Sequence, residues 1–202
     1  MLLNKFEFIS MNNPIRAFLQ SSIEVKEFRK LSKLPKDMNV LEIGCGNGLG
    51  TKLIMQHFAP KEICAIDLDP NMIQKAKKTY KYSNVFFSVG DATHLSFPDN
   101  SFNAVFDFGI IHHIPNWKDC LNELKRVLKP GGQLLIEDGS IETFSSTLFG
   151  KILRKLLAHP YDDMYTRSEF VSYLKSIGFS VAQYRLHNPL ELTSYFTLIA
   201  NK

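Results

Sequence analysis

The stretch Val40-Leu41-Glu42-Ile43-Gly44-Cys45-Gly46-Asn47-Gly48 runs from a short apolar segment straight into three glycines at alternate positions. The apolar part predicts a buried strand, and a helix-like segment follows over residues 49–58. Glycine lets the backbone pass close to a ligand because it has no side chain to occupy the ligand's space. The free amides at the start of the following helix face the same place. We therefore expect a nucleotide-type site at the end of this strand.

The spacing of the glycines distinguishes between kinds of nucleotide. A dinucleotide fingerprint reads G-x-G-x-x-G/A, but counting from Gly44 puts Leu49 at the last position, and counting from Gly46 puts Thr51 there. Neither register fits. Glu42 instead precedes the first glycine, where its carboxylate would repel a pyrophosphate. The loop therefore favours a positively charged ligand, and an NAD(P)-dependent oxidoreductase is the weaker alternative.

Four more motifs follow in order along the chain. They are a strand over 63–67 that ends in Asp67, the turn Gly90-Asp91-Ala92, a strand over 104–108 that leads to His112-His113, and Pro130-Gly131-Gly132 before a strand over 134–136. Together with the glycine loop they span roughly residues 35 to 140, and in order and spacing they resemble the class I S-adenosylmethionine-dependent methyltransferases, in particular the small type 11 group.

The resemblance implies a cofactor, S-adenosylmethionine (SAM), and a set of residues that hold it: Glu42, Gly44, Cys45, Gly46, Gly48, Asp67, Leu68, Asp91, Ala92 and Phe108. Asp67 would accept hydrogen bonds from two ribose hydroxyls. Leu68 and Ala92 would sandwich the adenine, and Asp91 would accept from its amino group. The Phe108 carbonyl would lie near the ammonium of the methionine part.

For two of these acidic residues, Glu42 and Asp91, a second role remains open. Glu42 either complements the positive charge of the ligand or holds the glycine loop in place. Asp91 either contacts the adenine or only shapes a turn, and we favour the contact. A helix-cap role, the alternative for Asp67, fits Asp69 better because Asp69 immediately precedes Pro70.

Methyl transfer needs positioning and exclusion of water more than a covalent nucleophile. A general base helps only where the acceptor has a proton to lose. His112 and His113 leave the fourth strand where the methyl group should point, so one of them is a candidate base; the alternative is that they fix the loop. Tyr161, Tyr165 and Asp138 are weaker candidates for lining an acceptor pocket.

Strands and helices alternate from residue 38 onward, which predicts an α/β fold: a doubly wound, seven-stranded, mostly parallel, Rossmann-like sheet. Strands over 181–186 and 196–200 would form an antiparallel C-terminal hairpin. Local signals include an Asn116 cap, a helix stop at 130–132 and a Thr166-x-x-Glu169 capping box. We expect one domain over 1–202, divided as follows: an N-terminal helical cap (1–34), a cofactor-binding core (35–138), an insertion or lid (139–165), and a C-terminal helix and hairpin (166–202).

Two segments lie outside the core motifs. The first, 1–34, has a helix-like apolar side made by Ile15, Phe18, Leu19 and Ile23. In the insertion, Phe144, Leu148, Ile152 and Leu156 recur every four residues, opposite Lys151, Arg154 and Lys155. The resemblance implies that both segments cover the acceptor, while simple packing on the core is the alternative. The apolar insertion leaves room for a lipophilic or membrane-associated acceptor, such as a quinone or lipid precursor.

The composition indicates which classes of partner and cofactor to expect. The net charge of +4 is mild and spread out, with short runs such as residues 75–78, so no nucleic-acid partner is expected. Cys45, Cys64 and Cys120 have neither metal nor disulfide spacing; we expect no metal and a reducing cytoplasm. The sequence has no apolar run of transmembrane length and no secretion signal. The oligomeric state stays open.

The acceptor is narrowed by elimination. The Asp107-Phe108-Gly109-Ile110 turn lacks the two prolines typical of enzymes that methylate base or glutamine amines. The sequence therefore predicts a methyltransferase that acts on a small molecule and releases S-adenosylhomocysteine (SAH). A catalytically silent, SAM-binding accessory subunit is the alternative from another class.

Overall fold

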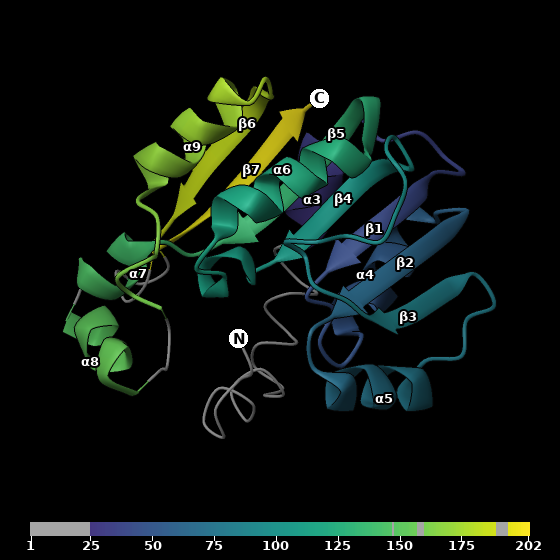
Figure 1. Ribbon diagram of the computed structural model, residues 1–202, viewed down its shortest axis with the longest axis horizontal. Helices are drawn as coiled ribbons and strands as arrows, with labels where there is room; N and C mark the ends of the chain where they lie inside the picture. Colours follow the sequence, from purple (N-terminus) through teal and green to yellow (C-terminus); the bar gives the residue numbers. More distant parts are fainter. Residues whose placement is uncertain (1–24, 147, 157–159, 189–193) are drawn as a thin grey trace.

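The computed structural model describes residues 25–146, 148–156, 160–188 and 194–202. Its centre is a seven-stranded sheet in the order β3-β2-β1-β4-β5-β7-β6 (Figure 1). The strands are β1 (Asn39–Ile43), β2 (Glu62–Asp67), β3 (Val85–Val89), β4 (Phe102–Phe108), β5 (Leu128–Asp138), β6 (Ser180–His187) and β7 (Tyr195–Asn201). β7 runs antiparallel to both of its neighbours, and the other pairings are parallel. This confirms the predicted doubly wound sheet with its C-terminal antiparallel hairpin.

Helices cover both faces of the sheet. They are α3 (Val25–Leu31), α4 (Leu49–Phe58), α5 (Pro70–Thr79), the short 3-10 helix η2 (Ile111–His113), α6 (Trp117–Val127), α7 (Ile141–Ser145), α8 (Leu148–Leu156) and α9 (Arg167–Ser176). One buried cluster joins α6 and α9 to the sheet, and a second joins α3, α4 and α5 to it. In Figure 1, α6 and α9 lie in front of the strands, while α3 and α4 lie behind them.

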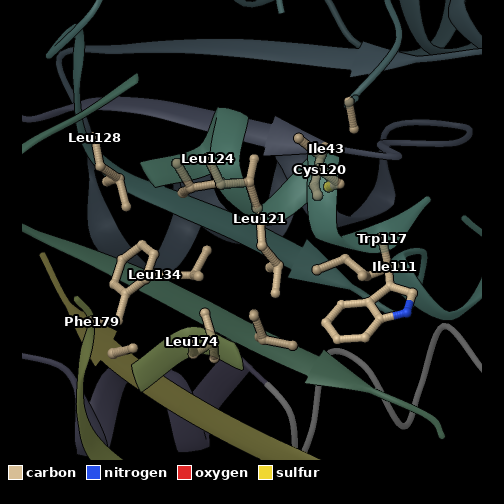
Figure 2. Close-up of a cluster of buried hydrophobic side chains, with 14 of the residues drawn as sticks. Ile43, Ile111, Trp117, Cys120, Leu121, Leu124, Leu128, Leu134, Leu174 and Phe179 are labelled. Atoms are coloured by element: carbon tan, nitrogen blue, oxygen red, sulfur yellow. The ribbon is translucent and has the colours of Figure 1, made fainter. Parts of the chain in front are cut away.

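The strand residues reach both clusters because successive side chains point to opposite faces. In β1, Leu41 and Ile43 belong to the α6 side, and Val40 belongs to the α4 side. Figure 2 shows the α6 side, where Leu121 and Leu124 of the helix lie over Leu134 of β5. The central strands are therefore buried on both faces, as their near-continuous apolar sequences predicted.

Several helix ends follow their local signals. Asp69 accepts a hydrogen bond from the Asn71 amide at 2.8 Å, ahead of Pro70 at the first turn of α5. The Thr166 hydroxyl accepts from the Glu169 amide at 3.2 Å, and the Glu169 carboxylate accepts from the Thr166 amide at 2.8 Å. These contacts involve neighbouring residues, so the sequence alone can specify them.

The end of α6 differs from the prediction. The helix ends at Val127, and residues 130–132 belong to β5 rather than acting as a stop after the helix. The cause is a distant contact: the Gly131 amide donates to the Lys202 carbonyl, and the Lys202 amide donates to the Gly132 carbonyl, each at 3.0 Å. Asn116 precedes α6 but makes no side-chain cap; its amide group donates to Asp119 at 3.2 Å instead.

The insertion also differs. The four-residue apolar repeat predicted one continuous stripe, but α7 and α8 are separate helices. Phe144 on α7 is buried, whereas Ile152 and Leu156 on α8 are 50% and 52% exposed. The N-terminal repeat of Ile15, Phe18, Leu19 and Ile23 lies outside the described residues. Within the part of the chain that the structure describes, no helix has the length and apolar character needed to cross a bilayer.

Candidate active site

A cavity of about 200 Å³ opens at the carboxyl ends of β1, β2, β3 and β4. It lies where the strand order reverses between β1 and β4, which is where open α/β sheets bind ligands. All but one of the residues expected to hold the cofactor line it: Glu42, Gly44, Cys45, Gly46, Asp67, Leu68, Asp91, Ala92 and Phe108. The fold thus brings together motifs that are up to 66 residues apart in the sequence.

The glycines of the loop are required for different structural reasons. Gly44 has a φ of 62°, and a Cβ there would come within 2.3 Å of the Ile110 side chain, so this glycine allows the exit of β4 to pack against the loop. Gly46 has a φ of 52°, and a Cβ there would meet no atom within 4 Å. The Gly46 position therefore leaves open space at the cavity wall.

Gly48 is the expected residue that does not line the cavity. It has a φ of 88° and caps the start of α4. A Cβ there would lie 2.8 Å from the Tyr80 ring and 3.2 Å from the Ala76 methyl. Gly48 therefore starts α4 and allows it to pack against α5 and the residues that follow, which is a contact between elements that the glycine spacing could not indicate.

Asp67 is fixed by the backbone around it. Its Oδ2 accepts from the Gly46 amide at 2.8 Å, and its Oδ1 accepts from the Asp69 amide at 2.9 Å. A carboxylate oxygen has two lone pairs, so each oxygen keeps capacity for a ligand hydroxyl. Burial raises the pKa of Asp67, against the lowering effect of the two amides.

On the other side of the cavity, Asp91 shapes a turn and also lines the cavity. Its Oδ1 accepts from the amide and the hydroxyl of Thr93, both at 2.8 Å, and so forms a turn. The side chain is exposed and still lines the cavity. Leu68 and Ala92 line it as well, the first 44% exposed and the second buried.

Glu42 is almost fully buried at the base of the cavity, and its Oε2 accepts from the Thr51 hydroxyl. Gly50 makes room for it, because a Cβ at that position would come within 2.2 Å of Oε1. Burial raises the pKa of Glu42 to about 8, with a further contribution from the charge of Asp67 and an opposing one from Thr51. Near neutral pH this group is therefore mostly protonated.

The two candidate histidines have different surroundings. His113 lines the cavity, whereas His112 does not. The Nδ1 of His112 is in contact with Asp138 at the end of β5, and its amide donates to the same carboxylate at 3.1 Å. The two imidazole rings are 4.2 Å apart between centroids. His113 is therefore the residue of the pair that can meet an acceptor, and His112 lies behind it.

Asp138 is the centre of a buried polar group. Besides His112, it accepts from the Tyr165 hydroxyl at 2.8 Å and from the Gly139 amide at 2.6 Å, and it is 1% exposed. Burial and the neighbouring Asp138 raise the pKa of Asp107 well above its usual range. Asp138, Tyr165 and Tyr161, the weaker acceptor-pocket candidates, do not line the cavity.

Sequence reasoning missed part of the wall. The missed residues are Ile110 before His113, Ile114, Pro115 and Asn116 after it, and Met72 of α5. The first four follow directly after the fourth strand, so the position of the strand end was a usable signal. Among the described residues, no cluster of His, Cys, Asp or Glu has the arrangement of a metal site.

Comparison with known proteins agrees with this geometry. Residues 41–136 match the type 11 family described as "Methyltransferase domain". A fatty-acid O-methyltransferase from Mycolicibacterium smegmatis is 36% identical over 99 residues, covering 49% of this chain and 36% of that protein. A demethylmenaquinone methyltransferase from Listeria welshimeri is 36% identical over 120 residues, covering 57% and 50%. A SAM-dependent methyltransferase structure from Aquifex aeolicus superposes with a TM-score of 0.75 at 21% identity over 98% of both chains.

The chain therefore belongs to the class I SAM-dependent methyltransferases. Its core is a methyltransferase domain of the type 11 group. The cofactor of this family is SAM, and the cavity suits it: Gly46 leaves space, Asp67 offers acceptors for hydroxyls, and Leu68 and Ala92 offer apolar surface. The chain spans a third to a half of the length of these two relatives.

Proposed function

We propose that this chain is an enzyme that transfers the methyl group of SAM to a small lipophilic acceptor and releases SAH. The observation that carries the proposal is the charge of the cavity. Glu42, Asp67, Asp69 and Asp91 line it, while its described lining contains no lysine or arginine. A pyrophosphate would be repelled there, and a ligand with positive charge would be attracted.

Different residues of the cavity are expected to bind different parts of SAM. When bound, SAM supplies a methyl group on a positively charged sulfur. We expect Asp67 to accept from the ribose hydroxyls with the lone pairs that Gly46 and Asp69 leave available. We expect Asp91 to hold the adenine end, and the loop backbone at residues 44–46 to lie against the methionine part. Glu42 lies at the base of the cavity, where its ionised form would balance the positive charge of the ligand.

The acceptor side is expected at His113 and the residues that follow it. The names of two relatives, a fatty-acid O-methyltransferase and a demethylmenaquinone methyltransferase, support a lipophilic acceptor. Ile110, Ile114 and Pro115 add apolar wall beside His113. A carboxylate acceptor arrives without a proton, whereas a ring carbon or hydroxyl must lose one, and His113 is placed to accept it.

The test combines binding and turnover. Calorimetry with SAM, SAH and NADH should give binding for the first two alone. SAH release is then measured with a saturated fatty acid and with a demethylated naphthohydroquinone, kept reduced, as acceptors. NADH binding with no SAM binding would overturn the proposal. Binding of SAM without turnover on either acceptor would favour the accessory-subunit alternative.

A further inference from the structure

Helix α8 exposes two large apolar side chains to solvent. Ile152 and Leu156 lie one turn apart on the same side of the helix, and each is about half exposed. Gly150 is buried and lies two residues before Ile152, which places it on nearly the opposite side. Among the side chains of α8 that the structure describes, Ile152 and Leu156 therefore point to solvent, while the backbone at Gly150 is covered.

Cations border this apolar side. Lys151 and Lys155 are exposed and occupy the positions next to Ile152 and Leu156 along the helix, and α8 contains no acidic residue. Arg154 is also exposed, and its guanidinium lies 4.9 Å from the centre of the Tyr161 ring. An exposed apolar side with a lysine border is the pattern of a helix that lies in the interface of a membrane.

The helix is connected to the acceptor side of the cavity. α7 begins three residues after the carboxyl end of β5 and packs against α8. From α8, Arg154 stacks on Tyr161, whose ring lies 5.5 Å from Phe144. Phe144 in turn lies 6.2 Å from His112, beside His113. In Figure 1, α7 and α8 stand together at one end of the molecule, with α5 at the other.

We propose that α8 docks this protein on a bilayer surface rich in anionic lipids, with Ile152 and Leu156 inserted among the acyl chains and Lys151 and Lys155 at the headgroups. Charge complementarity selects this occupant, because a bordering pair of lysines without an acid fits a negative surface. The inference extends the proposed function, since a lipophilic acceptor dissolves in bilayers. The vesicle assay below needs no turnover. A failure of membrane binding would therefore leave the proposed methyltransferase function intact, and a failure of turnover would leave the membrane proposal intact.

The experiment is co-sedimentation of the purified chain with vesicles of phosphatidylcholine alone or mixed with phosphatidylglycerol. The wild type should bind the mixed vesicles more tightly, and added salt should weaken that binding. K151E/K155E should lower the partition coefficient on mixed vesicles by at least about 25-fold, since each lysine contributes about fivefold near an anionic surface. I152Q/L156Q should lower it by about tenfold or more through lost apolar insertion.

A matched control carries the same change of charge elsewhere. Lys77 and Lys78 are exposed on α5, so K77E/K78E alters net charge equally without touching α8. Equal losses for K77E/K78E and K151E/K155E would overturn the proposal, as would equal wild-type binding to both kinds of vesicle. A concentration-dependent dimer that I152Q/L156Q abolishes, without vesicle binding, would assign this face to a second copy and overturn it too. Circular dichroism checks that each variant is folded.

Discussion

Asp67 is the carboxylate with the most defined geometry in the cavity, and its removal is expected to weaken the binding of SAM. Two backbone amides fix its oxygens at 2.8 and 2.9 Å, so it meets a ligand without reorganising. Asp67→Ala should reduce the binding free energy by at least about 1.5 kcal/mol, as expected for charge-assisted hydrogen bonds. Titration calorimetry with SAH measures this loss.

The control for that variant is Glu62→Ala. Glu62 begins the same strand, β2, at its other end, and it does not line the cavity. Its removal should leave the affinity for SAH unchanged. Equal affinity of the wild type and Asp67→Ala would exclude Asp67 from the site.

Glu42 gives the protein a dependence on pH that can be tested through stability. Its pKa is about 8 in the fold and 4.5 as a free side chain, so the folded state binds this proton more tightly. Stability from this group is therefore complete below about pH 4.5 and is lost as pH rises toward 8. Glu42→Gln keeps an acceptor for Thr51 but cannot titrate.

Relative to the wild type, the stability of Glu42→Gln should increase with pH between 5 and 8, by up to about 1.4 kcal/mol per pH unit. Urea unfolding at several pH values gives the difference between the two proteins. Because other titrating groups are common to both, their contributions cancel. A difference that stays constant across this range would contradict the raised pKa.

At the scale of elements, η2 is held against the end of β5 by Asp138, and this separates its two histidines. His113→Asn should lower turnover by about 100-fold for an acceptor that must lose a proton, with SAH affinity unchanged. His112→Asn should mainly lower the free energy of unfolding, by about 1–3 kcal/mol, because Asp138 loses its imidazole partner while buried. Initial rates, calorimetry and urea unfolding are measured on both. Full activity in both variants would contradict the proposal that one of these histidines is a general base.

The elements that the sequence predicted well are those whose determinants are local. Asp69 before Pro70 and the Thr166–Glu169 box each act within a few residues, and the structure has both as expected. The location of the cavity was predictable for a related reason: motifs at the carboxyl ends of parallel strands meet at one edge of the sheet.

Features that depend on distant contacts were not predictable. The extension of β5 over residues 130–132 depends on hydrogen bonds to Lys202. The need for a glycine at position 48 depends on the Tyr80 ring that packs against it. For the apolar repeat of the insertion, the sequence left open whether it covers an acceptor or packs on the core, because periodicity gives the apolar side of a helix but not the direction in which that side faces. The exposure of Ile152 and Leu156 on α8 is visible only in the fold.

At the scale of the whole molecule, the cavity joins loops from both halves of the sheet, so a ligand there should stabilise the entire fold. The loops after β1, β2 and β3 form one side and the residues after β4 form the other. A ligand that binds only the folded state adds RT ln(1 + [L]/Kd), which is about 2.7 kcal/mol at a concentration of 100 Kd. For a chain of 202 residues this corresponds to a rise in Tm of about 5–10 °C.

SAH at 100 times its measured Kd should therefore raise the Tm by that amount in differential scanning calorimetry. NADH at the same concentration should leave the Tm unchanged, because Asp67, Asp69 and Asp91 line the cavity that its pyrophosphate would enter. Asp67→Ala should show a smaller shift at the same SAH concentration, since its Kd is higher. An equal shift with NADH would contradict the charge argument, because the carboxylates could then not be selecting against phosphate.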